Sequence, residues 1–103
     1  MPSPLPPLPH AGRLHWSADV INAHQGLTSA YLASQRALEL DESDPIRLGH
    51  HLKQAETFMS SIINALALQP DNPLPDGYIR TIKERVEELV VELRVAHKEA
   101  ASV

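Results

Sequence analysis

Histidine is the residue type in this chain best suited to chemistry near neutral pH, because its side chain titrates there and can bind metals. The chain contains six histidines and no cysteine, so thiol catalysis and thiolate metal sites are excluded. His24, His51 and His97 fall on or beside the apolar lines of three long amphipathic segments. The other histidines lie in the N-terminal arm or are expected to point to solvent.

His51 and His97 are the strongest candidates for a shared site. If three helices run up, down and up, both residues lie near the same end of the bundle, with Ser34 at a similar level. One hypothesis is a small-ligand or metal site, or a proton-transfer pair, built on these histidines. The other is a pair of core-edge histidines with ordinary hydrogen bonds. Bundle metal sites usually add a carboxylate or a second histidine one turn away, and neither residue has one. The spacing therefore predicts no metal and no other cofactor.

The sequence contains few motifs that would indicate catalysis or nucleic-acid binding. The sequence has no Gly-rich phosphate loop, no nucleophile elbow and no HExxH motif, so we expect no enzyme. Its formal net charge is −4 with neutral histidines, whereas nucleic-acid binding requires a basic footprint. A DNA-associated regulator stays an alternative only through a local patch of Arg80, Lys83, Arg94 and Lys98, whose field the interleaved glutamates weaken.

The last third of the chain predicts a long amphipathic helix over residues 77–100. Its apolar residues recur in steps of three and four, which places them on one side of a 3.6-residue helix. They are Ile79, Ile82, Val86, Leu89, Leu93 and Ala96. Asp76 is expected to cap this helix. The acidic ladder of Glu84, Glu88 and Glu92 is interpreted as a solvated face, with a docking strip for a basic partner as the alternative.

Two further helices are predicted at about residues 17–40 and 45–68 from their starts and stops. Ser17 is a good N-cap, and Asp44 followed by Pro45 is a cap with proline at the first helical position. Gly26 weakens the first helix by about 1 kcal/mol relative to alanine, so it indicates either a close contact or a slight bend. The apolar line of the first helix lies beside a stripe of small residues, which would let a neighbouring helix approach closely. These two lines are Val20, Leu27, Tyr31 and Leu38, and Ala23, Ala30, Ser34 and Ala37.

Together these elements predict an all-α fold. Three helices of similar length with short connections favour an up-down-up three-helix bundle in residues 16–103. Residues 1–15 form a proline-rich N-terminal arm. The arm contains PxxP patterns, which are typical of ligands for aromatic-lined grooves. The alternatives are a leader that packs on the bundle through Leu5 and Leu8, or a disordered arm.

Four aliphatic residues point away from the predicted core. Ile21 and Leu32 on the first helix, with Val91 and Val95 on the third, suggest a second apolar surface. We therefore predict homo-oligomerisation, most simply as a two-fold dimer. The predicted function is a non-enzymatic protein–protein interaction module, such as an adaptor, an inhibitor or an assembly subunit, which also binds another protein.

The sequence also predicts a cytoplasmic protein without a membrane partner. No apolar run approaches the ~18 residues of a membrane span. The N-terminus lacks the basic region and the continuous apolar run of a secretory signal.

Overall fold

The computed structural model describes residues 5–8, 16–68, 74 and 76–102, and its regular secondary structure is entirely α-helical. The helices are α1 (Ala18–Glu39), α2 (Pro45–Ala67) and α3 (Tyr78–Ala101). Each boundary lies within one residue of its predicted position. The all-α prediction is therefore confirmed for the described part of the chain.

The starts of α1 and α2 use the caps that the sequence predicts. Ser17 has an extended backbone, and its Oγ accepts a hydrogen bond from the Val20 amide at 3.2 Å. Asp44 Oδ1 accepts from the Ile46 amide at 2.9 Å, with proline at the first helical position. Each side chain satisfies one of the amides that has no partner within its helix, so the start of each helix is fixed locally.

A residue in the left-handed backbone conformation terminates α1. Asp41 has φ 53°, and the amide of Glu42 donates to the Ala37 carbonyl at 3.0 Å. The Asp41 amide donates to the Leu38 carbonyl at 3.2 Å. This pair of bonds is a Schellman motif, in which aspartate occupies the position that glycine usually takes. It ends the helix and leads directly into the cap of α2.

The predicted cap of α3 is wrong. The N-cap is Gly77 rather than Asp76, and no side chain caps the helix. Gly77 adopts φ 78°, a left-handed conformation that glycine tolerates because it has no Cβ. Its carbonyl accepts from both the amide and the hydroxyl of Thr81, at 2.8 and 2.9 Å. The chain thus turns into the helix at the glycine, one residue later than a carboxylate cap would place it.

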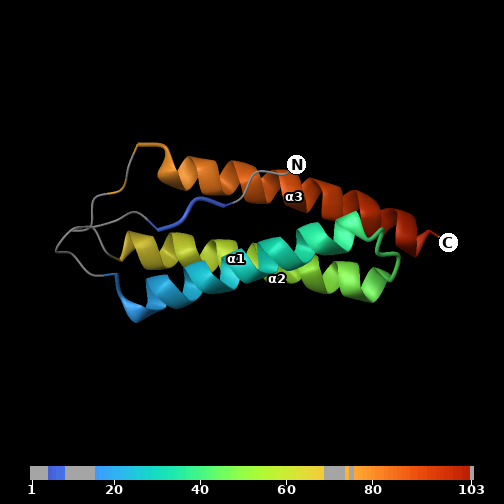
Figure 1. Ribbon diagram of the computed structural model, residues 1–103, viewed down its shortest axis with the longest axis horizontal. Coiled ribbons are helices and arrows are strands. Elements are labelled where there is room, and N and C mark those ends of the chain that lie inside the picture. The colour runs from blue at the N-terminus through green and yellow to red at the C-terminus, as the bar shows by residue number, and fades with distance from the viewer. Residues whose placement is uncertain (1–4, 9–15, 69–73, 75, 103) are drawn as a thin grey trace.

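The three helices lie lengthwise in an elongated molecule of 53 × 24 × 17 Å (Figure 1). Every pair of helices is in contact, and α1 contacts α3 least extensively. The close approach of α1 to α2 matches the predicted stripe of small residues. Ala23 is buried there, and Gly26 faces the ring of Phe58. None of the helices in these described residues is long and apolar enough to cross a membrane.

The apolar lines of the three helices form one core. Ile62, Val86 and Leu93 are fully buried, and Leu52 is partly buried against them. The buried hydrophobic residues are Val20, Ala23, Leu27, Tyr31, Leu48, Ala55, Ile62, Leu66, Tyr78, Ile82, Val86, Leu89, Val90 and Leu93. The prediction that each helix hides its apolar side against the others is therefore confirmed.

Tyr78 is expected to make the stability of the fold fall in alkali. Burial raises the pKa of Tyr78 from 10.0 to about 12, and its hydroxyl has no hydrogen-bond partner among the residues that the structure describes. Between these two pH values the unfolded chain loses the tyrosine proton while the folded chain keeps it. The free energy of unfolding therefore falls as pH rises, by roughly 2–3 kcal/mol over the whole shift. Urea titrations from pH 9 to 11 would measure this slope.

Tyr78→Phe should reduce that slope and be nearly neutral at pH 7, because it removes a buried hydroxyl that has no partner in the described part of the chain. Burial also raises the pKa of Tyr31. A smaller slope of the same sign should therefore remain in the Tyr78→Phe variant. Identical slopes for Tyr78→Phe and the wild type would contradict the expectation.

Candidate functional site

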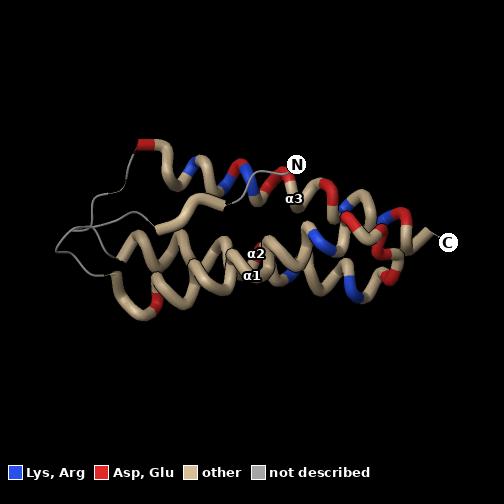
Figure 2. Tube along the Cα trace, viewed as in Figure 1, with Lys and Arg blue, Asp and Glu red and all other residues tan. Residues whose placement is uncertain are grey.

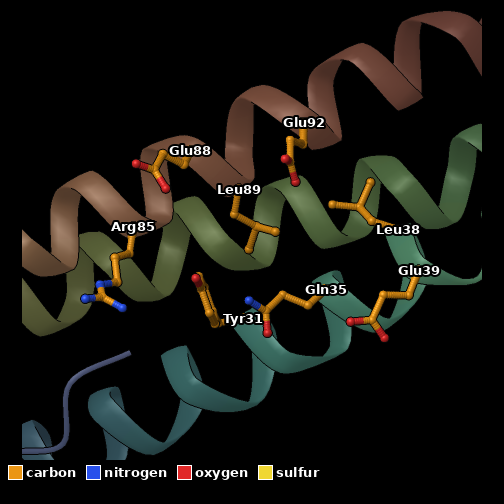
Figure 3. Close-up of a pocket in the computed structure, with 8 residues that line it drawn as sticks. All are labelled: Tyr31, Gln35, Leu38, Glu39, Arg85, Glu88, Leu89 and Glu92. Carbon is orange, nitrogen blue, oxygen red and sulfur yellow. The ribbon is translucent and has the colours of Figure 1, made fainter. Parts of the chain in front are cut away.

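A cleft lies between α1 and α3. Its central hollow has a volume of about 370 Å³ and is lined by both helices (Figure 3). The lining residues are Tyr31, Gln35, Leu38 and Glu39 of α1, and Arg85, Glu88, Leu89 and Glu92 of α3. A second hollow of about 330 Å³ continues the cleft toward Ala96 and Ala100, at the end of α3. Both volumes lie in the range of small-ligand and peptide-anchoring pockets.

The central hollow has an apolar floor and an acidic rim. Tyr31 and Leu89 are each 4% exposed and form part of its floor. Figure 3 shows the side chains of Glu88 and Glu92 extending from α3 at the edge of the hollow, near Arg85. Burial is the main cause that raises the pKa of Tyr31. Arg85 opposes this effect, and Glu88 adds to it. The phenol of Tyr31 therefore stays neutral near pH 7.

Part of the N-terminal arm packs on the same side of the bundle. Leu5 and Leu8 are partly buried against the core, and His24 Nε2 donates a hydrogen bond to the Pro6 carbonyl at 3.1 Å. In Figure 1 this segment runs beside α3, between it and the other two helices. The hypothesis that the arm packs through Leu5 and Leu8 is thus confirmed for residues 5–8. The remaining prolines of the PxxP patterns, with His10 and His15, lie outside the described residues.

His51 and His97 have different neighbours. A Cβ added at Gly49 would lie 3.5 Å from His97 Nε2, so His97 packs against the backbone of α2 at the predicted height. The ring of His51 lies beside that of His50, with 6.1 Å between their centroids. Burial is the main cause that lowers the pKa of His51, and His50 acts in the same direction. In the part of the chain that the structure describes, no group of three or more His, Asp or Glu residues could hold a metal ion.

One cation of the basic patch predicted on α3 is already engaged. Arg94 Nη2 forms an ion pair with Glu56 Oε1 of α2 at 2.9 Å. Because the Glu56 carboxylate lies beside Arg94, the patch offers less positive field to a phosphate backbone than its residue count indicates. The geometry therefore adds no support to the DNA-associated alternative.

The four residues predicted to point away from the core are exposed. Ile21, Leu32, Val91 and Val95 are 39, 55, 58 and 53% exposed. Sequence reasoning did not single out Leu40, Ile46 and Leu68, which are more exposed still at the helix ends. Charge is unevenly distributed as well. It follows α3 throughout, whereas α1 between Asp19 and Arg36, and α2 beyond Glu56, carry none (Figure 2).

Comparison with known proteins finds no matching family, curated protein or solved structure.

Proposed function

We propose that this chain is a non-enzymatic, all-helical interaction module: an up-down-up three-helix bundle that self-associates as a two-fold dimer. We further propose that the protein is cytoplasmic and that it binds a second, different protein. The observation that carries it is the exposure of Ile21, Leu32, Val91 and Val95 on helices that already bury a complete core.

Contacts between helix ends support the up-down-up arrangement. Asn22, early in α1, and Leu68, just after α2, line one surface hollow, so the start of α1 lies beside the end of α2. Gly49, early in α2, lies beside His97, late in α3. Both contacts are those expected if consecutive helices run in opposite directions, as short connections favour.

The proposal places all four side chains in one contact, and together they are then sufficient for a weak dimer. Fully burying one aliphatic side chain stabilises by about 1.5–3 kcal/mol, so burying the exposed half of one contributes roughly 1 kcal/mol. A two-fold interface doubles each contribution. The total is then comparable to the low end of the association cost of about 4–15 kcal/mol. We therefore expect a dimer that forms at high protein concentration and dissociates on dilution.

Light scattering across a concentration series tests the proposal. Val91→Glu/Val95→Glu should convert the dimer into a monomer, because it places two carboxylates in the apolar contact. Ser60→Glu/Asn64→Glu is the matched control, since it adds the same charge at the same spacing on exposed positions of α2 and should leave the dimer intact. A wild-type chain that stays monomeric at high concentration, with a mass unchanged by Val91→Glu/Val95→Glu, would refute the proposal.

A further inference from the structure

The segment Leu5–Leu8 packs against the helices in the way that a bound peptide would. Leu5, Pro6 and Leu8 are partly covered, whereas Pro7 is exposed. In an extended proline-rich segment with three residues per turn, residues three apart lie on the same side. Leu5 and Leu8 therefore share the side that packs against the core, and Pro7 faces outward.

The hydrogen bond from His24 fits this mode of recognition. Proline has no amide hydrogen, so Pro6 and Pro7 can offer only their carbonyl oxygens to a binding surface. His24 Nε2 supplies the donor at 3.1 Å from the Pro6 oxygen. The two leucine side chains supply the contacts that depend on sequence, and the carbonyl contact fixes the position of the backbone.

The central hollow, with its acidic rim, lies next to the segment along the cleft between α1 and α3. Tyr31 and Gln35 follow His24 along α1, and Figure 3 shows the blue segment approaching the Tyr31 and Arg85 side of the hollow. The two hollows of the cleft between α1 and α3 are not lined by Leu5–Leu8, so this part of the cleft lies beyond the segment.

We propose that this cleft is a recognition groove for the Leu5–Leu8 segment, and that its occupant in trans is the same segment of a second copy of this chain. An exchanged segment makes the same contacts as the resident one, so the exchange loses no contact energy. The second copy as the source rests on the self-association proposed above, whereas the groove itself does not.

The groove is tested with a fluorescein-labelled peptide of residues 2–9 added to the full-length chain. The receptor carries Leu5→Ser/Leu8→Ser, which releases its own segment. Saturable anisotropy is expected, with binding at least tenfold weaker to the wild-type chain, because the resident segment competes at high local concentration. A peptide with the same two serines should not bind. Adding His24→Phe to the receptor should weaken binding by about fivefold, the effect of one lost hydrogen bond.

Circular dichroism establishes that each receptor remains helical, and Leu5→Ala/Leu8→Ala is the milder alternative if the serine variant unfolds. No saturable binding to a folded receptor, or equal binding of the serine peptide, would overturn the groove.

The source of the segment is tested separately. The chain has no cysteine, so Pro7→Cys gives a single site for a nitroxide label. In a mixed dimer with an unlabelled ¹⁵N chain, the amide signal of His24 in the ¹⁵N chain should broaden. A dimer by light scattering without this broadening would overturn the second copy as the source. A chain that stays monomeric would instead refute the proposed self-association. The peptide-binding experiment would still test whether the cleft is a recognition groove.

Discussion

Leu27→Ala should lower the free energy of unfolding by about 2–5 kcal/mol, the range for a buried leucine whose removal leaves a cavity. Leu27 is 1% exposed and lies on the side of α1 that faces the core. Alanine favours helix slightly more than leucine does, so helix propensity cannot account for a loss. A domain of this size has about 5–15 kcal/mol in total, so the variant should lose a large share of its stability. Urea titration followed by circular dichroism would measure it.

Leu32→Ala is the matched control, because the same substitution is made five residues further along the same helix. Leu32 is 55% exposed, so its truncation should change stability by no more than about 0.5 kcal/mol. Both variants are measured at low concentration, where self-association does not contribute to stability. Equal losses for the two leucines would contradict the packing of α1. A loss for Leu32→Ala that appears only at high concentration would instead indicate that Leu32 lies in the dimer contact.

The helices could be predicted because their starts and stops depend on local sequence. Ser17 and Asp44 act on amides two or three residues away, so no knowledge of the fold was needed to place them. Asp76 shows the limit of this reasoning. The same residue type failed as a cap because the chain turns at Gly77, and the conformation of a glycine is not determined by its own side chain.

The candidate site was harder to predict because it depends on rotation about the helix axes. Height along a bundle follows from 1.5 Å per residue, and the contact of His97 with α2 occurs at the predicted level. That contact is made at Gly49. Residues two apart lie about 200° apart around a helix, so His51 points in a different direction. The cleft has the same origin, since Tyr31 and Gln35 form a site only because α3 lies at a particular distance from α1.

Gly26 is where the sequence left two alternatives, a close contact or a bend, and the structure supports the contact. A Cβ added there would lie 2.9 Å from Cζ of Phe58 and closer still to Cδ1 and Cε1. Such separations are shorter than van der Waals contact, so the ring must move. Phe58 is partly buried against the core, and moving its ring outward gives up part of that burial.

Gly26→Ala should therefore destabilise the protein by about 1–3 kcal/mol, the usual cost of overpacking, although alanine favours helix by up to about 1 kcal/mol. Gly49→Ala is the control. Its Cβ would meet His97 at 3.5 Å, an ordinary contact, so only the helix preference acts and stability should rise. Urea titrations of the two variants would thus show shifts of opposite sign.

A double-mutant cycle with Phe58→Ala identifies the ring as the cause. Without the ring, a Cβ at residue 26 has no obstacle and partly fills the space that the ring leaves, so Gly26→Ala should become stabilising in that background. The change of sign separates steric conflict from a bend, because a bend in the backbone of α1 would make Gly26→Ala unfavourable whether or not the ring is present. A loss of the same size in both backgrounds would therefore show that Gly26 bends the helix, and that α1 and α2 are not brought together by the contact with Phe58.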